Sequence, residues 1–318
     1  MQNSGEAGVD ITVVVPVLNE EQSVALLYQE LLSVLGATGQ VFELLFVDDG
    51  STDGTYAVLE RLHQQDARVK VIRFRRNFGK SAALAAGFEA AAGEVVFTMD
   101  GDLQDSPMEI PRFLAQLAEG YDLVSGWKYP RHDPLGKTLP SRLFNWTVAM
   151  TTGVKLHDFN CGFKAYRREV VKEIRLYGEL HRYTPILAYQ RGFHVTEIKV
   201  AHRPRKYGRS KYGFRRFARG FFDLLTVLFL GAYTWRPLHM FGWAGIGAFS
   251  LGFLINLYLA ILWFTGRGPI GNRPLLTLGV LLMTVGMQFF SIGLLAEMIT
   301  HGQAGQQASY SIRNRLGE

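Results

Sequence analysis

Residues 94–107 read "EVVFTMDGDLQDSP", an apolar run that ends on three aspartates within six residues. The valines and the phenylalanine of the run predict a buried strand. Three carboxylates this close together repel one another, so we expect positive charge to reach them from outside the stretch. A divalent cation would supply this charge, and a phosphorylated substrate is the other candidate ligand, which such a cation could join to the carboxylates.

The residues around this stretch alternate between strand and helix patterns. Continuous apolar runs predict strands buried on both faces, at residues 11–17, 42–47, 69–74 and 94–99. Helical periodicity between the runs predicts an α/β fold, a Rossmann-like, mostly parallel sheet with helices on both faces. Ligands bind such sheets beyond the carboxyl ends of the strands. There, "VDDGSTDGT" (residues 47–55) follows the second strand and "DGDLQD" (residues 100–105) follows the fourth.

One phosphate-binding motif is excluded. "NFGKSAAL" (residues 77–84) places Gly-Lys-Ser at the start of a helix, as a P-loop does. A P-loop also needs a glycine five residues before Gly79, and the chain has Phe74 there. We therefore interpret this segment as an ordinary helix start.

The charge of the chain is uneven. Its 318 residues contain 34 Lys and Arg against 28 Asp and Glu. Residues 201–219, "AHRPRKYGRSKYGFRRFAR", carry eight basic residues and no acidic one, which suits nucleic acid, anionic lipid headgroups or a polyphosphate substrate. The lone Cys161 excludes an internal disulfide and fits a reducing compartment.

The C-terminal third has the composition of membrane-spanning helices. Residues 238–264 contain no charged side chain, and residues 275–300 contain only Glu297. About 20 apolar residues span a bilayer, so both segments are long enough, and the short linker between them predicts a transmembrane hairpin. Two buried core helices are the alternative. If the segments do span the membrane, the position of the basic stretch next to the first span argues against nucleic acid as its partner.

An amphipathic helix is predicted at residues 213–232, just before the first span. Phenylalanines and leucines recur at helical spacing, with arginines on the other side, as in helices that lie in the headgroup layer. A surface helix of the soluble domain is the alternative.

The basic residues also predict the topology. They concentrate before the first span, whereas the linker has only Arg267 and Arg273, and residues 1–10 lack the features of a signal peptide. We expect a multi-pass protein of the cell membrane with both termini cytoplasmic. The expected parts are an N-terminal tail (residues 1–10), a catalytic domain (11–212) and the interface helix (213–232). Two membrane spans (238–264 and 275–300) and a C-terminal tail (301–318) follow.

Three motifs resemble a known family. "VVVPVLNEE" (13–21), "VDDGSTDGT" and "MDGDLQDSP" (99–107) look like the inverting GT-A glycosyltransferases of family 2. "DFNCGFKAYRR" (158–168), "HRPRKYGRSKYG" (202–213) and the hairpin narrow the resemblance to polyprenyl-phosphate glycosyltransferases. That group includes dolichyl-phosphate mannosyltransferases and undecaprenyl-phosphate glucosyltransferases. The similarity covers roughly residues 10 to 300.

The resemblance implies a donor site with a metal ion. Asp100, Asp102 and Gln104 would bind Mg²⁺ or Mn²⁺, hard cations that join carboxylates to substrate phosphates. The nucleotide sugar would be bound by Pro16, Asn19, Glu20, Asp48, Asp49 and Asp100. The alternatives are purely structural roles: Asp49, Ser51 and Asp53 would only build a turn and cap the helix after Gly54. Asp105 and Ser106 would only cap the helix that follows them.

The resemblance also implies a lipid-phosphate acceptor. Acceptor and diphosphate would be bound by Lys128, Arg142, Arg205, Ser210 and Lys211. The family has an arginine where this chain has Lys128, and an ammonium cannot bind phosphate through two parallel hydrogen bonds. Asp102 and Asp158 are expected to be catalytic. Asp158 would act as a base or as a positioning residue, with a turn-stabilising role as its alternative.

The function that follows is inverting transfer of one hexose to undecaprenyl phosphate at the cytoplasmic membrane face, giving a lipid-linked sugar for the cell envelope. A UDP-hexose is the expected donor and a GDP-hexose the alternative. Two rivals are a processive polysaccharide synthase, which would carry a Q-x-x-R-W string that this chain lacks, and a non-catalytic sugar-nucleotide sensor. A homo-oligomer is left open.

Overall fold

The chain divides into two compact units, Met1–Val227 and Leu228–Glu318. The computed structural model describes residues 8–129, 153–176, 178, 180–201, 203, 237–266, 269, 271 and 273–304. The predicted amphipathic helix at residues 213–232 lies outside the described residues, as do Arg142, Arg205, Ser210 and Lys211.

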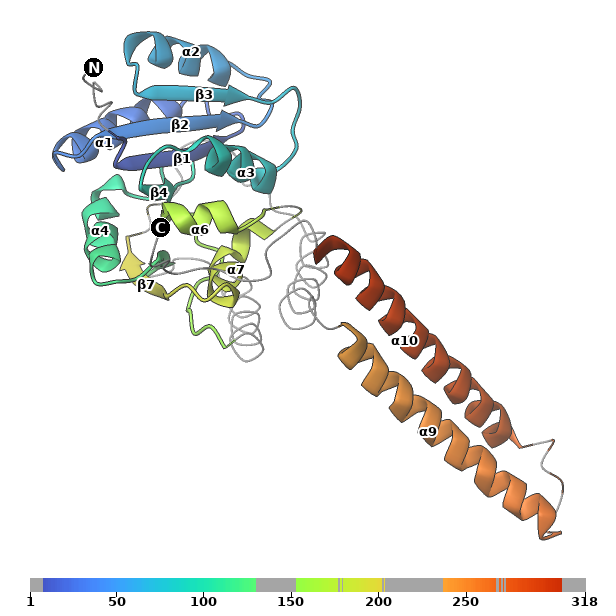
Figure 1. The fold of residues 1–318 in the computed structure, drawn as a ribbon. Helices are drawn as coiled ribbons and strands as arrows, with labels where there is room; N and C mark the ends of the chain where they lie inside the picture. Colours follow the sequence, from blue (N-terminus) through green and yellow to red (C-terminus); the bar gives the residue numbers. More distant parts are fainter. Residues whose placement is uncertain are drawn as a thin grey trace, which may run out of the picture. The chain divides into compact units, whose positions relative to one another are not determined.

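The described part of the first unit is built on a seven-stranded sheet of order β3-β2-β1-β4-β6-β5-β7 (Figure 1). The strands are β1 (Ile11–Val17), β2 (Phe42–Asp48), β3 (Val69–Arg73), β4 (Val95–Thr98), β5 (Leu123–Lys128), β6 (Lys164–Arg167) and β7 (Val195–Val200). β6 runs antiparallel to β4 and β5, and the other pairs are parallel. This confirms the mostly parallel α/β fold.

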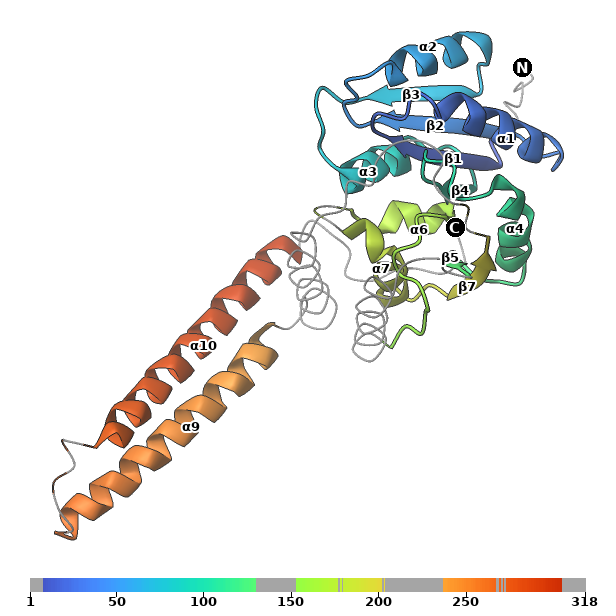
Figure 2. The ribbon, with the colours of Figure 1, turned by 180° about the vertical axis from the view of Figure 1, so that it is seen from behind.

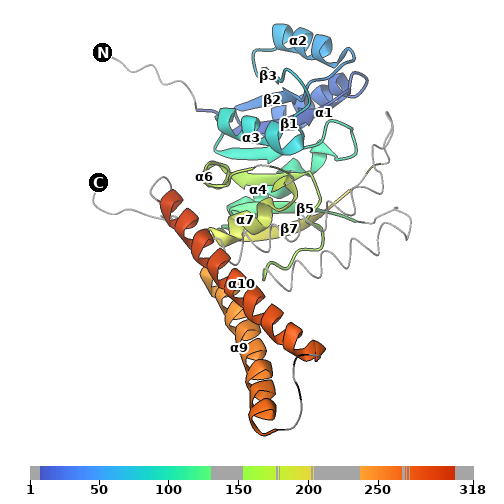
Figure 3. The same cartoon turned by 90° about the vertical axis from the view of Figure 1, so that its right-hand side faces the viewer.

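Helices cover both faces of the sheet (Figures 2 and 3). One face packs against α1 (Val24–Gly36), α2 (Thr55–Gln65) and α4 (Ile110–Ala118). The other packs against α3 (Lys80–Ala90), α6 (Arg168–Glu173) and α7 (Thr184–Gln190). Two 3₁₀ turns, η1 (Pro107–Glu109) and η2 (Leu180–Arg182), complete the described elements of the first unit.

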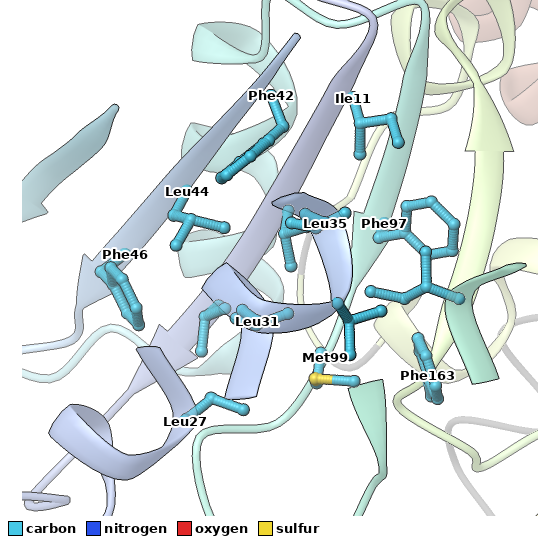
Figure 4. Close-up of a cluster of buried hydrophobic side chains, with 14 of the residues drawn as sticks. Ile11, Leu27, Leu31, Leu35, Phe42, Leu44, Phe46, Phe97, Met99 and Phe163 are labelled. Carbon is cyan, nitrogen blue, oxygen red and sulfur yellow. The ribbon is translucent and has the colours of Figure 1, made fainter. Parts of the chain in front are cut away.

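The core fixes the loop after β1. Leu27, Leu31 and Leu35 recur at four-residue spacing on α1 and are fully buried against β2, where Phe42, Leu44 and Phe46 face them (Figure 4). Burial of a leucine side chain contributes roughly 1.5–3 kcal/mol, so α1 is held firmly on the sheet. The short loop between β1 and α1 is consequently fixed at both ends.

The register of the parallel strands gathers the acidic loops at one edge. Val17 pairs with Asp48, and Val14 pairs with Thr98, so β1, β2 and β4 end within a few residues of one another. The loops that start at residues 18, 49 and 99 therefore leave the sheet on the same side. The three motifs that resemble family 2 come from these loops.

The second unit contains two long apolar helices, α9 (Pro237–Phe264) and α10 (Pro274–Ala304), which pack side by side as a hairpin. Each is long and apolar enough to cross a membrane. Glycines let the backbones approach, because a Cβ at Gly286 would lie 2.6 Å from the carbonyl oxygen of Gly245. The Glu297 carboxylate on α10 accepts a hydrogen bond from the backbone N–H of Leu238 (3.2 Å). That N–H lies in the first turn of α9, where backbone N–H groups have no partner within the helix. The predicted helical hairpin is confirmed.

Candidate active site

Asp100 and Asp102 lie in the loop directly after β4. The side chain of Asp100 is about one-third exposed (31%), whereas Asp102 is buried. The loop turns sharply at Leu103, which has a φ of 61°, and the backbone N–H of Gln104 then donates to Oδ1 of Asp102 (3.2 Å). The three predicted metal ligands thus belong to one tight turn at the carboxyl edge of the sheet.

The positive charge beside Asp100 comes in part from Lys80, the first residue of α3. The Lys80 Nζ and Asp100 Oδ1 form a hydrogen-bonded ion pair. Burial alone would raise the pKa of the Asp100 carboxyl, but Lys80, and then Lys128, hold that pKa well below its usual range. Lys80 is not among the predicted site residues, although it belongs to the Gly-Lys-Ser segment that resembles part of a P-loop.

A neutral histidine stands next to Lys80. The Nδ1 of His181 and the hydroxyl of Ser81 are 2.8 Å apart, and the backbone N–H of His181 donates to the same hydroxyl (3.2 Å). Burial, and then the charge of Lys80, lower the pKa of His181 far below its ordinary value. The imidazole therefore adds no charge to the site near neutral pH.

Lys128 is held inside the site by Asp105. Their Nζ and Oδ1 atoms are 3.2 Å apart, and the Asp105 side chain is fully buried. Burial alone would lower the pKa of Lys128, but the Asp105 carboxylate raises it above its usual range. Lys128 therefore carries its charge at the edge where the acceptor phosphate was predicted to bind.

The alternative of a helix cap at Asp105 and Ser106 is wrong. Ser106 makes no side-chain capping hydrogen bond to the turn η1 that follows it. Its hydroxyl accepts instead from Nη2 of Arg203 (3.0 Å), and Asp105 pairs with Lys128. Both side chains are used by partners that lie far away in the sequence.

Arg203 ties the described start of the basic segment to the metal-ligand turn. Its Nη1 donates to both carboxylate oxygens of Glu30 on α1 (3.0 and 2.9 Å). Its backbone N–H donates to the carbonyl of Gln104 (2.9 Å). Arg203 is not among the predicted site residues, because nothing in the sequence distinguishes it from the other seven basic residues of its segment.

Asp158 and Gly162 belong to the segment just before β6, and Gly162 lies directly against Asp100. Asp158 is buried, and its Oδ1 accepts from the backbone N–H of Asn160 (3.1 Å). A Cβ at Gly162 would lie only 2.7 Å from Oδ2 of Asp100, so the absence of a side chain lets this loop lie directly against the carboxylate. The carbonyl of Gly162 is fixed by a hydrogen bond from Oγ1 of Thr98 (2.8 Å).

The buried Lys164 is hydrogen-bonded to the same segment between Asp158 and β6. Lys164 on β6 donates to the carbonyls of Cys161 and of Phe159, the latter at 3.4 Å. Burial lowers the pKa of Lys164 to about 8. Its charge is thus satisfied mainly by backbone dipoles, which fixes the segment between Asp158 and β6.

The predicted nucleoside residues after β1 are joined to the loop after β2. Asn19, with a φ of 54°, donates its N–H to Oγ of Ser51 (2.9 Å), and its Oδ1 accepts from Thr52 N–H (2.8 Å). The N–H of Glu20 donates to Oγ1 of Thr55 (2.8 Å). Pro16 is half-buried near the end of β1.

Asp48 and Asp49 differ in what they contact. Oδ1 of Asp48 accepts from Ser51 N–H (2.9 Å), while its Oδ2 is buried without a hydrogen-bond partner, 3.7 Å from Arg73 Nε. Asp49 accepts instead from the backbone N–H groups of Phe78 (2.7 Å) and Gly79 (2.9 Å). Asp49 therefore fixes the start of α3 and Lys80, whereas Asp48 is fully buried and forms an ion pair with Arg73.

The donor set fits a hard divalent cation. Asp100, Asp102 and Gln104 offer oxygen ligands, which Mg²⁺ and Mn²⁺ prefer. Within the described part of the chain, no three His, Cys, Asp or Glu side chains gather closely enough to hold a metal by themselves. Such a site needs further oxygen ligands, and substrate phosphates supply them in sites of this kind.

Comparison with known proteins agrees with this architecture. Residues 12–175 match the family model "Glycosyl transferase family 2", and residues 236–301 match "GtrB C-terminal hairpin". The chain belongs to glycosyltransferase family 2 and is a glycosyltransferase with a GtrB-type membrane hairpin.

Two curated relatives are similar over nearly the whole chain. One is a dodecaprenyl-phosphate galacturonate synthase from Rhizobium johnstonii, 38% identical, covering 96% of this chain and 92% of the relative. The other is an undecaprenyl-phosphate 4-deoxy-4-formamido-L-arabinose transferase from Pseudomonas paraeruginosa, 38% identical, covering 91% and 84%.

A solved structure shares the fold. The Mycobacterium tuberculosis glucosyl-3-phosphoglycerate synthase, in complex with Mn²⁺, UDP and phosphoglyceric acid, is 20% identical with a TM-score of 0.54. The match covers 70% of this chain and 78% of that one, and supports the GT-A architecture of the first unit.

Proposed function

We propose that the protein transfers one hexose or related sugar from a nucleotide sugar to a polyprenyl phosphate, with inversion at the anomeric carbon. The proposal depends on two features that occur in the same chain. One is the turn after β4 that contains Asp100, Asp102 and Gln104, and the other is the membrane hairpin. The names of the two relatives, both polyprenyl-phosphate transferases, support the same acceptor class.

The donor would bind across the edge where β1, β2 and β4 end. Asp48, whose buried Oδ2 lies 3.7 Å from Nε of Arg73, would form the floor of the nucleoside pocket, and Pro16, Asn19 and Glu20 would line it. Asp49 would act indirectly, because its hydrogen bond to the backbone N–H of Gly79 fixes the start of α3 beside the donor site. Asp100, Asp102 and Gln104 would hold Mg²⁺ or Mn²⁺, which, when bound, neutralises the charge of the departing diphosphate.

The acceptor needs no general base, because a phosphate monoester is largely ionised near neutral pH. One of its oxygens attacks the anomeric carbon, and the bond from that carbon to the diphosphate breaks on the opposite face, which inverts the configuration. Lys128 and Arg142 would bind the acceptor phosphate. Arg205, Ser210 and Lys211 would close over it, and Asp158 would orient these groups or the donor sugar.

The site would work at the cytoplasmic face of the cell membrane. The basic residues before α9 outnumber those in the linker between α9 and α10, which favours cytoplasmic termini. The product would be a lipid-linked sugar for modification of the cell envelope.

A reconstituted assay tests the proposal. Purified protein in detergent is given Mn²⁺, undecaprenyl phosphate and a panel of UDP- and GDP-linked sugars that includes galacturonate and 4-deoxy-4-formamido-L-arabinose. Mass spectrometry is expected to show the lipid phosphate plus a single sugar, with an inverted anomeric bond by NMR. Excess EDTA and the variant Asp102→Ala are each expected to abolish the product. A ladder of longer products would indicate a processive synthase, and full activity in EDTA would refute the metal site.

A further inference from the structure

Lys80 stands apart among the lysines of the described site. Lys128 pairs with the buried Asp105, and Lys164 donates to backbone carbonyls. Lys80 pairs with Asp100, one of the two carboxylates expected to bind the metal. Its side chain and that of Asp100 are both about one-third exposed, at 32% and 31%, so solvent and solutes can reach the pair.

The position of Lys80 is fixed although its side chain is long. Asp49 accepts hydrogen bonds from Phe78 and Gly79, which anchors the backbone immediately before Lys80 to the end of β2. Gly79 has a φ of 96°, a left-handed conformation that suits glycine and directs the chain into α3. The ammonium thus moves only by rotation about its own four-carbon stem.

A metal ion and Lys80 compete for Asp100. Two cations in contact with one carboxylate repel each other strongly in a partly buried site. An incoming nucleoside diphosphate brings negative charge to the same place, and an ammonium with three rotatable donors can turn from a carboxylate to phosphate oxygens without movement of the backbone.

We propose that Lys80 is an exchangeable counter-ion. It neutralises Asp100 in the empty site, yields Asp100 to the metal when the donor binds, and then pairs with the donor diphosphate. This inference rests on the proposed function, because it requires a metal and a diphosphate at this edge.

Two consequences follow for binding. Metal alone binds weakly, because it must displace Lys80 and leave that ammonium without its partner. Metal and nucleoside diphosphate bind cooperatively. The diphosphate draws Lys80 away from Asp100 and so frees that carboxylate for the metal, and the metal neutralises Asp100 and so frees Lys80 for the diphosphate. Each ligand therefore raises the affinity for the other by the same factor. Lys80 would thereby keep the site from retaining a metal ion in the absence of the donor.

The test measures binding without turnover. Binding of Mn²⁺ alone is measured from the electron paramagnetic resonance signal of free Mn²⁺ during titration of the whole chain in detergent. Binding of UDP or GDP in the presence of Mn²⁺ is measured by isothermal titration calorimetry. The variants are Lys80→Met, the charge-conserving Lys80→Arg, and Lys172→Met, which removes an exposed lysine of α6. Circular dichroism checks that each variant is folded.

Lys80→Met is expected to bind Mn²⁺ alone about fivefold more tightly than wild type, the gain expected from removing a competing surface ion pair. The same variant is expected to bind UDP or GDP in the presence of Mn²⁺ on the order of tenfold more weakly, because a charge-assisted hydrogen bond to the diphosphate is lost. Lys80→Arg is expected to retain the wild-type pattern, and Lys172→Met to show neither change.

Opposite shifts in the two affinities support the exchange. Unchanged or weaker binding of Mn²⁺ alone by Lys80→Met would overturn it, and so would unchanged binding of the nucleotide. Asp102→Ala separates this result from failure of the proposed function: if that variant binds Mn²⁺ as wild type does, the metal site itself is wrong.

Discussion

Lys164 shows what a buried charge costs at the scale of one residue. Only 2% of this residue is exposed, and burial lowers the pKa of its ammonium from an ordinary 10.5 to about 8. Below the folded pKa both states carry the proton, and the folded state bears the full cost of the buried charge. Between about 8 and 10.5 only the unfolded chain keeps the proton, so the cost is relieved as pH rises.

A pH series of unfolding measurements checks this. The stability of wild type relative to Lys164→Met is expected to increase between pH 8 and pH 10.5, because the variant has no proton to lose at this site. Thermal unfolding midpoints of both proteins in detergent give the difference at each pH. Lys172→Met, which removes an exposed lysine, serves as the control. A difference that stays constant across the window would contradict the lowered pKa.

Residues of the site were predictable from the sequence where they are neighbours in it. Asp100, Asp102 and Gln104 lie within five residues after a strand, and the structure places them in one turn. Lys80 is twenty residues away from Asp100, and their pairing depends on α3 starting beside the end of β4. The missing glycine at position 74 excludes a P-loop role for Lys80, but nothing near Lys80 in the sequence indicates its ion pair with Asp100.

At the scale of elements, the hairpin depends on close contact between glycines. A Cβ at Gly286 would lie 2.6 Å from both the carbonyl oxygen of Gly245 and the backbone nitrogen of Phe249. Backbone atoms cannot turn aside as a flexible side chain can, so a larger residue must push α9 and α10 apart. Helix association in membranes relies on close packing of this kind, because lipid gives no hydrophobic drive for it.

Gly286→Val is therefore expected to destabilise the hairpin by about 1–3 kcal/mol, the usual cost of overpacking. Gly247→Val is the matched control, because it makes the same chemical change in α9 at a position with no neighbouring atom within 4 Å. Helix content during heating in detergent, followed by circular dichroism, compares the two. Equal unfolding midpoints would show that the glycine contact does not hold the helices together.

Elements were predictable where the local pattern was strong. β1 to β4 follow from apolar runs between clear helices, and α9 and α10 follow from uninterrupted apolar sequence. β5 and β7 were not predicted. The run that forms β7, "VTEIKV", mixes charged and apolar residues, and all but Val200 are partly or fully exposed. Its place beside β5 comes from pairing between distant segments, which local periodicity does not encode.

At the scale of the whole molecule, sequence composition predicts which parts meet water and which meet lipid. Large apolar side chains are exposed along α9 and α10, including Trp243, Leu254 and Met298. Exposure of this extent is unusual in a soluble protein and ordinary in a span that faces lipid. The side of the membrane on which the first unit lies is predicted from charge alone and needs its own experiment.

The distribution of arginine and lysine predicts that the loop between α9 and α10 faces away from the cytoplasm. A cysteine at Gly271 tests this, because that residue is exposed with no atom near its Cβ position. In a Cys161→Ser background, Gly271→Cys is expected to react with a membrane-impermeant maleimide on intact cells. Glu60→Cys, at an exposed position of α2 in the first unit, is expected to react only after lysis. The reverse pattern would place the first unit outside the cytoplasm, where a cytoplasmic nucleotide sugar could not reach Asp100 and Asp102.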